Sequence, residues 1–364
     1  MEIETVNLLK KVYKTDNTAL IISGTGTYGM EMTLRSLFEP GERIAVVNGG
    51  IFGAVAISIA RIVGLDPVSI DFEEGCHIDV DRIRDVVLKD DSIKAVYVAH
   101  DETTTGVMAP LREIGEVCRE RDLLFIVDAI SSISGADLRT DEWGIDVCIA
   151  SAQKCMNGPQ GLVLLAVSDK AYAKMNARKT PIDSLSLDLG TWTRYHETKV
   201  KGYLDWWKKG GKPPVFDCRA PHEVSPPCTL VWGLQGALED ILAEGLDRRF
   251  ARHAVAGKAM REGIKAMGAN LFTEECAASE VVTVVALPHE IDERELREFL
   301  LNKHHLAIGN GEVAHTVRIG TMGITASEKY VLPCLNSLAD GLSHFGLKTD
   351  AGAGLAAAAT LFCA

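Results

Sequence analysis

Short apolar runs rich in β-branched residues recur through the first half of the chain, and amphipathic stretches separate them. The runs occupy residues 19–22, 43–47, 67–70, 95–99, 123–127, 147–150 and 162–167. Near-continuous apolar runs are typical of parallel strands that are covered on both faces. Helical periodicity falls between the early runs, for example at residues 30–37 and 111–121. The alternation predicts βαβ units and therefore an α/β fold with a mainly parallel sheet.

The pattern changes in the second half. Residues 174–227 combine scattered aromatics, several prolines and a basic cluster at residues 208–212, without clear periodicity. We expect a long excursion there, with a functional or interfacial role. Next come predicted helices at residues 230–243 and 249–267, then strand, helix, strand and helix at residues 281–287, 293–302, 315–319 and 327–345. We therefore predict a large domain over residues 1–244, a smaller α+β domain over 245–348 and a tail over 349–364.

Composition narrows the class of ligand. The 364 residues are 47% hydrophobic, which is enough for one substantial core and a second, smaller one. The formal net charge of −12 repels nucleic-acid phosphates and anionic lipids, so we expect neither nucleic acid nor membrane as a partner. The amino terminus lacks the apolar run of a secretory signal, and the apolar tail at residues 351–364 is too short to cross a bilayer. We expect the tail to be a frayed end.

The cysteines and histidines indicate no metal site. No C-x-x-C pair or zinc-like spacing occurs. His77, His304 and His305 have no metal-ligand partners at a suitable spacing. We expect reduced thiols and a cytoplasmic protein. The nine cysteines are Cys76, Cys118, Cys148, Cys155, Cys218, Cys228, Cys276, Cys334 and Cys363.

A glycine-rich turn, GTGTYG at residues 24–29, follows an apolar strand and opens a helix. Backbone N–H groups and the helix dipole at such a place bind phosphate. The turn also spells the dinucleotide motif G-x-G-x-x-G, which requires a carboxylate at the end of the second strand. That strand ends VVNGG at residues 46–50, without a carboxylate. The sequence therefore favours a phosphate site over a dinucleotide site, and a turn needed only for tight packing is the structural alternative.

A carboxylate and a lysine each follow a predicted strand. Asp128 ends the run at residues 123–127, and ligands of open parallel sheets bind at the carboxyl ends of strands. Capping of the next turn is the alternative role for Asp128. Lys154 follows the run at residues 147–150 within SAQK, and a lysine that emerges from a buried strand is costly unless it is paired or chemically used.

The S-x-x-K spacing of Ser151 and Lys154 also occurs in serine β-lactamases and penicillin-binding enzymes. These enzymes need S-D-N and K-T-G elements as well, and neither appears in the chain. An aldehyde cofactor, by contrast, needs a lysine amine, a carboxylate for its pyridine nitrogen and a helix N-terminus for its phosphate. The glycine turn, Asp128 and Lys154 supply all three, so the sequence favours pyridoxal 5′-phosphate (PLP).

Six segments in order give the chain a resemblance to the class V aminotransferases, from about residue 12 to residue 345. It resembles the alanine–glyoxylate, serine–pyruvate and 2-aminoethylphosphonate aminotransferases. The resemblance implies a fold-type I PLP-transferase, an α/β protein that is a homodimer and carries PLP as a Schiff base on Lys154. The segments are SGTGT at 23–27, NGGIFG at 48–53, HDETTTG at 100–106, the strand that ends at Asp128, SAQK at 151–154 and VRIG at 317–320.

The resemblance also implies roles for single residues. The phosphate would be bound by Thr25, Gly26 and Thr27, with Gln153 as a further contact. The pyridine ring would lie between Phe52 and Ile130, and Thr103 would lie near its 3′-oxygen. Lys154 and Asp128 would be the catalytic residues. Arg318 would bind the carboxylate of the substrate, for which a bidentate guanidinium is suited.

Two further positions concern the dimer and the start of the chain. Ser225 would reach the phosphate of the partner subunit, and His222 stands where the family usually has tyrosine. Family members usually begin some tens of residues earlier, with a glycine–proline segment that lines the substrate site. The excursion at residues 199–221 is a candidate replacement for that segment.

We therefore predict a PLP-dependent transaminase. It would move the amino group of a small amino acid of the alanine or serine type to a 2-oxo acid such as glyoxylate or pyruvate, and Lys154 would carry the proton. The alternatives are a 2-aminoethylphosphonate–pyruvate type of transaminase and another fold-type I lyase or desulfurase. A PLP-binding regulator without activity and an NAD-dependent dehydrogenase are further alternatives from other classes.

Overall fold

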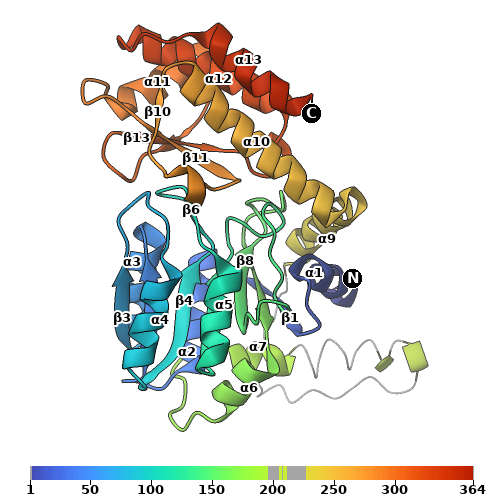
Figure 1. Ribbon diagram of the computed structural model, residues 1–364. Coiled ribbons are helices and arrows are strands. Elements are labelled where there is room, and N and C mark those ends of the chain that lie inside the picture. Colours follow the sequence, from blue (N-terminus) through green and yellow to red (C-terminus); the bar gives the residue numbers. More distant parts are fainter. Residues whose placement is uncertain (1, 196–204, 207, 211–226, 364) are drawn as a thin grey trace.

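A seven-stranded sheet forms the centre of the larger domain (Figure 1). The computed structural model describes residues 2–195, 205–206, 208–210 and 227–363. All seven strands predicted in the first half are confirmed, and the sheet order is β1-β9-β8-β7-β4-β2-β3. Only β9 runs antiparallel to its neighbours β1 and β8. The strands are β1 (Thr18–Ser23), β2 (Arg43–Asn48), β3 (Asp66–Asp71), β4 (Ile93–Ala99), β7 (Leu124–Asp128), β8 (Val147–Ser151) and β9 (Leu162–Val167).

Helices cover both faces of this sheet, which explains why its inner strands are mainly apolar, whereas the edge strand β3 buries only Ile70. One face packs against α2 (Gly26–Leu37), α3 (Ile51–Ile62), α6 (Asp169–Asn176) and α7 (Leu189–Tyr195). The other face packs against α1 (Glu2–Tyr13), α4 (Val80–Lys89), α5 (Leu111–Glu120) and α9 (Cys228–Glu244). With both faces covered, the ends of the strands are left for a ligand.

The smaller domain has its own core and a four-stranded antiparallel sheet of order β10-β11-β13-β12. The predicted elements of this half are all present, so the fold class is confirmed. The helices are α10 (Leu246–Ala266), α11 (Glu293–His304) and α12 (Glu328–His344), with short 3-10 turns η2 (Glu275–Ala277) and η3 (Gly323–Thr325). The strands are β10 (Asn270–Leu271), β11 (Val282–Ala286), β12 (Gly309–Asn310) and β13 (Thr316–Gly320).

The expectation of a frayed tail is wrong. Residues Ala351–Phe362 form helix α13, which begins at an N-cap where Asp350 Oδ1 accepts from Ala353 N at 2.9 Å. This helix packs along α10 and α12 at the outer end of the small domain (Figure 1). A Cβ atom on Gly354 would lie 2.8 Å from the carbonyl oxygen of Gly263, so the two backbones cross closely. The tail is therefore part of the small domain.

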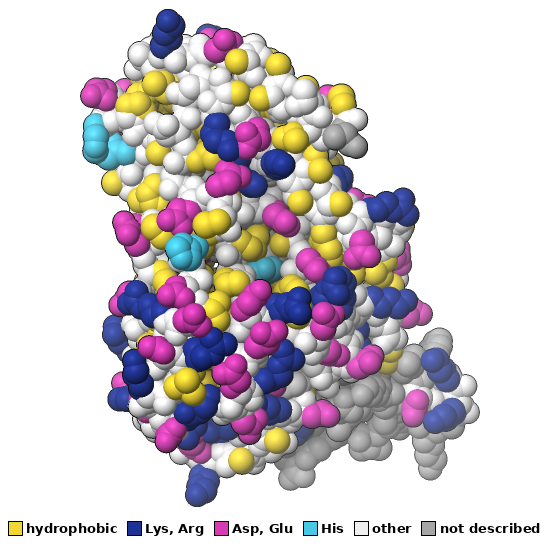
Figure 2. Space-filling model, in the orientation of Figure 1, with side chains coloured by type: hydrophobic (Ala, Val, Ile, Leu, Met, Phe, Trp, Pro, Cys, Tyr) yellow, Lys and Arg dark blue, Asp and Glu magenta, His cyan; other side chains and the backbone are white. Residues whose placement is uncertain are grey.

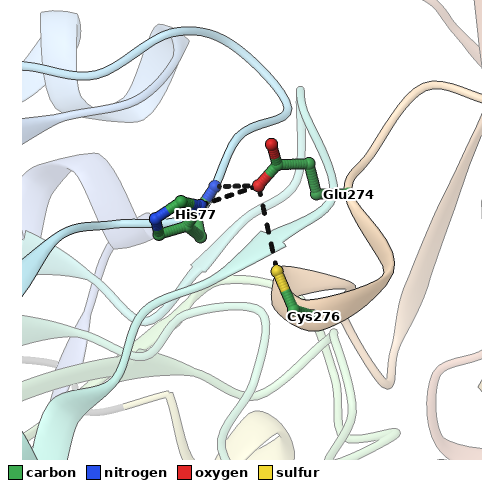
Figure 3. A group of neighbouring side chains, drawn as sticks. All are labelled: His77, Glu274 and Cys276. Carbon is green, nitrogen blue, oxygen red and sulfur yellow. Dashed lines mark hydrogen bonds and ion pairs between the residues drawn. The ribbon is translucent and has the colours of Figure 1, made fainter.

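Several contacts join the two domains. The hairpin of β5 (Asp101–Glu102) and β6 (Val107–Met108) reaches the small domain, where Ser279 N donates to Gly106 O at 2.8 Å. His77, in the loop before α4, contacts Glu274 of the small domain, with 2.8 Å between Nδ1 and Oε2 (Figure 3).

His77 is an interface residue, as expected, but it has two neighbours in space that its spacing along the chain does not reveal. Side-chain atoms of His77, Glu274 and Cys276 that could bind a metal ion lie within 4.8 Å of one another, although almost 200 residues separate His77 from the other two in the chain. Glu274 Oε2 already accepts from both His77 N and His77 Nδ1. We assign the cluster to the contact between the domains.

Acidic and basic side chains alternate over the surface shown in Figure 2. On that face the described residues form no continuous basic surface. No helix in the described part of the chain is long and apolar enough to span a membrane. None of the eight described cysteines forms a disulfide.

Candidate active site

A cavity of about 200 Å³ opens where β4, β7 and β8 end and α2 begins. Nine of the predicted site residues line this one cavity: Thr25, Gly26, Thr27, Phe52, Thr103, Asp128, Ile130, Gln153 and Lys154. Three residues that the sequence did not single out, Met30, Asp101 and Ser131, line it as well.

The N-terminus of α2 forms one wall. Thr25 is its N-cap, and Thr25 Oγ1 accepts from Tyr28 N at 3.3 Å. The first N–H groups of a helix have no partners within the helix, and with the helix dipole they favour an anion. A Cβ atom on Gly26 would lie 2.4 Å from Ile130 Cδ1, so only glycine lets Ile130 close this side. This wall is suited to a phosphate.

Asp128 lies at the end of β7 and is 5% exposed. Its Oδ1 accepts from Ile130 N at 3.0 Å, and the Tyr97 hydroxyl lies 3.5 Å from Oδ2. Burial raises the pKa of Asp128 to about 7, against the opposing effect of the Ile130 N–H. A buried carboxyl group with remaining acceptor capacity is suited to bind a cationic N–H group.

Gln153 and Lys154 begin the turn after β8. Gln153 Oε1 is buried without a hydrogen-bond partner, and among the described residues Lys154 Nζ has neither a hydrogen-bond nor an ion-pair partner. Arg249 fixes the turn from the small domain, since its Nη2 donates to Cys155 O at 2.6 Å. The turn is therefore fixed, and the amine lies in the cavity wall.

Arg318 lies on β13 beside the cavity and does not line it. Its Nη1 donates to the carbonyl oxygen of Thr103 at 3.3 Å, and its Nε donates to Asn310 O at 2.8 Å. Glu312 Oε1 lies 3.6 Å from Nη2. Ser225 and His222 lie outside the described residues.

Known proteins are similar to this chain in sequence and in fold. The profile described as Aminotransferase class-V matches residues 4–196. An uncharacterized aminotransferase of Methanocaldococcus jannaschii is 32% identical over 95% of this chain and 85% of its own length. The chain belongs to the class-V aminotransferase family.

Two better-described relatives agree with this assignment. The crystal structure of ureidoglycine–glyoxylate aminotransferase from Bacillus subtilis superposes with a TM-score of 0.88 at 32% identity, covering 100% of this chain and 89% of the other. The serine–glyoxylate aminotransferase of Arabidopsis thaliana is 32% identical over 97% of this chain and 84% of its own length. The protein is therefore an enzyme, a transaminase of a PLP-dependent family.

Asp101 and Glu102 of this class-V aminotransferase are adjacent in the chain, but only Glu102 accepts hydrogen bonds through its carboxylate among the described residues. Glu102 accepts from Phe52 N at 2.9 Å, from Gly53 N at 3.3 Å and from Thr104 Oγ1 at 2.6 Å. It thereby caps α3, whose N-cap Gly50 provides no side chain, and it fixes the helix turn that carries Phe52. The sequence did not single out Glu102, because this role depends on α3 lying next to the β5 hairpin.

Asp101 has no such donors. It is 3% exposed, lines the cavity, and neither carboxylate oxygen has a hydrogen-bond partner among the described residues. The nearby Ser131 hydroxyl donates to the Asp101 carbonyl oxygen instead, at 3.1 Å. Burial raises the pKa of Asp101 to about 6. The hydroxyls of Ser279 and Ser131 lie close enough to lower this pKa, but neither has the geometry of a hydrogen bond to the carboxylate.

Proposed function

We propose that the enzyme transfers the amino group of a small amino acid of the alanine or serine type to glyoxylate or pyruvate, with PLP held at Lys154. The observation that carries this proposal is the single cavity in which Lys154, Asp128 and the N-terminus of α2 meet. Relatives named for glyoxylate as acceptor, from Bacillus subtilis and Arabidopsis thaliana, support the choice of acceptor.

The cavity fits the cofactor. The helix N-terminus would bind the phosphate, and the side-chain amide of Gln153, which lines the cavity, would donate to it from Nε2. Phe52 and Ile130 would lie against the two faces of the ring, with Thr103 near its 3′-oxygen. Asp128 would bind the ring nitrogen. Bound PLP would supply an electron sink for the bonds of the substrate's α-carbon.

The chain's own residues would do the remaining work. Lys154 Nζ would hold the cofactor covalently, and when released it would carry the proton that leaves the α-carbon and return it. Arg318 would bind the substrate carboxylate. Its Nη2 would then leave Glu312 and contact the substrate instead. Arg249 would keep Lys154 in place, and Glu102 would keep Phe52 in place, without contacting the substrate.

We also propose a homodimer in which Ser225 reaches the phosphate of the partner subunit, and domain limits at residues 244 and 245, between α9 and α10. A cytoplasmic location is proposed as well, because thiols remain reduced in that compartment and the eight described cysteines are free.

The test begins with the cofactor. Purified protein loaded with PLP is reduced with borohydride and digested, and we expect the cofactor on the peptide that contains Lys154. Lys154→Ala should fold with an unchanged circular dichroism spectrum and trap none, because the substitution deletes no core volume. Cofactor trapped on another lysine would contradict the assignment.

The substrates follow from a panel of donors. Alanine, serine, ureidoglycine, pyridoxamine and 2-aminoethylphosphonate are each assayed with glyoxylate and with pyruvate. We expect the highest kcat/KM for alanine or serine with glyoxylate. A preference for the aminophosphonate would move the assignment to that branch, and ammonia or sulfide release without amino transfer would indicate a lyase.

A further inference from the structure

The cavity contains a carboxyl group to which the proposed function gives no role. Three buried carboxyl groups lie at or next to the cavity, and they differ in the hydrogen bonds that they accept. Glu102 is saturated by the first turn of α3 and by Thr104. Asp128 is fixed by Ile130 N and would face the ring nitrogen. Asp101 alone has two oxygens without partners among the described residues.

Such a group is expensive to maintain. An ionised carboxylate without hydrogen bonds in a buried site costs several kcal/mol relative to water, so natural proteins retain one mainly where a ligand or a reaction uses it. Asp101 is also placed by backbone structure, since it pairs with Met108 in the β5–β6 hairpin. The backbone of Asp101 is therefore held beside the cavity by the hairpin.

The unpaired amine of Lys154 lies in the same cavity. The two groups interact electrostatically, yet they are not close enough for an ion pair in the structure. The other titratable groups around Asp101 are Glu102, Asp128 and the buried thiol of Cys155, whose pKa burial raises. Lys154 is thus the one cationic side chain among the described residues that line the cavity with Asp101.

We propose that Asp101 is the charge partner of Lys154 and stabilises the protonated form of the lysine nitrogen, both in its link to the cofactor and after its release. The proposal rests on the proposed function, because it assumes that Lys154 carries the cofactor. Asp101 acts through Lys154 and is therefore a positioning residue. A negative charge beside a protonated nitrogen raises the pH at which that nitrogen loses its proton.

The test is a spectrophotometric pH titration of the holoenzyme. The visible band of the protonated lysine–cofactor link disappears as the pH rises, and its midpoint is measured for the wild type and for Asp101→Asn. We expect the midpoint to fall by about one pH unit or more in the variant, as for opposite charges several ångströms apart at an effective dielectric constant of about 20. The pH profile of kcat/KM, which reports the free enzyme, should shift in the same direction.

Asp146→Asn is the matched control. Asp146 is also buried, but it immediately precedes β8, at the opposite end of this strand from Lys154, and it accepts from Phe125 N and Ser168 Oγ. Its replacement should leave the midpoint unchanged. If Asp101→Asn does not accumulate as folded protein, Asp101→Ala is titrated in its place, and failure of both to fold would show that Asp101 is structural and overturn the proposal.

The outcomes separate this proposal from the proposed function. A wild type that binds no PLP, or that traps it on another lysine, would refute the proposed function. A yellow enzyme with the cofactor on Lys154 and the same midpoint in Asp101→Asn as in the wild type would refute only the role of Asp101.

Discussion

At the scale of single residues, the surroundings of each carboxyl group decide what it can do. Asp128 could be predicted from the sequence, because a carboxylate at the end of an apolar strand is visible in the chain itself. Glu102 and Asp101 could not, although they lie in a motif that carries the family resemblance. The donors of Glu102 come from a helix some 50 residues away, and the isolation of Asp101 is a property of the packed cavity.

Asp128 makes the stability of the cofactor-free protein depend on pH. Burial raises the pKa of Asp128 from the ordinary value of 3.8 to about 7 in the folded protein. Between these two pH values, the folded protein keeps a proton on Asp128 that the unfolded chain has lost. The stability gained from the neutral carboxyl group is present below about pH 4 and is lost as the pH rises through about 7. In Asp128→Asn this loss is absent.

Thermal unfolding of both cofactor-free proteins between pH 5 and 8 measures the difference. The Tm of the variant minus that of the wild type should increase with pH. Added PLP should reduce this gain, because the ring nitrogen would pair with the carboxylate. A difference in Tm that does not change with pH would show that Asp128 is ionised throughout.

Arg318 distinguishes the two classes of amino donor. For an α-amino acid, the Arg318 guanidinium of the proposed site would bind the carboxylate through two N–H groups, and Arg318→Lys would keep the charge but lose this fork. The loss should be on the order of a few kcal/mol of transition-state binding, seen in kcat/KM for the amino acid and the 2-oxo acid alike. Equal activity of the variant and the wild type towards alanine or serine with glyoxylate would favour a phosphonate donor, whose tetrahedral head depends less on planar geometry.

At the scale of elements, the strands could be predicted and the last helix could not. Strands buried on both faces show as apolar runs that need no knowledge of their neighbours, and all seven runs of the first half became strands. Helix α13 is rich in Ala and Gly and has no polar face that would mark a helical period. Its position is decided by the close approach of Gly354 to Gly263 of α10, which only the three-dimensional structure shows.

Two glycines of α13 test this packing. A Cβ atom on Gly354 would lie 2.8 Å from Gly263 O, whereas one on Gly352 would meet only Asp350 Oδ1, at 3.4 Å. Gly352→Ala should therefore raise Tm, since alanine favours a helix by up to about 1 kcal/mol over glycine. Gly354→Ala should lower Tm despite the same gain in propensity, because the helices must move apart. Stabilisation by both substitutions would mean that α13 does not pack closely on α10.

At the scale of the whole molecule, an exposed apolar side chain provides a physical argument for the proposed homodimer. Trp232 is 62% exposed and lies on α9, which begins three residues after Ser225. If Ser225 reaches the phosphate of a partner, the start of α9 lies at the interface between the subunits, and a two-fold axis covers both copies of Trp232 at once.

We therefore expect the wild type to sediment as a dimer, and Trp232→Glu to shift it towards the monomer, because a charge would be buried against an apolar surface. Leu88→Glu is the control, since Leu88 is 48% exposed on α4 and should leave the dimer intact. Activity of Trp232→Glu should rise with protein concentration as the dimer re-forms, since each site would need Ser225 of the other subunit. A wild-type monomer with full activity would refute both the dimer and the role of Ser225, because every site would then be complete within one chain.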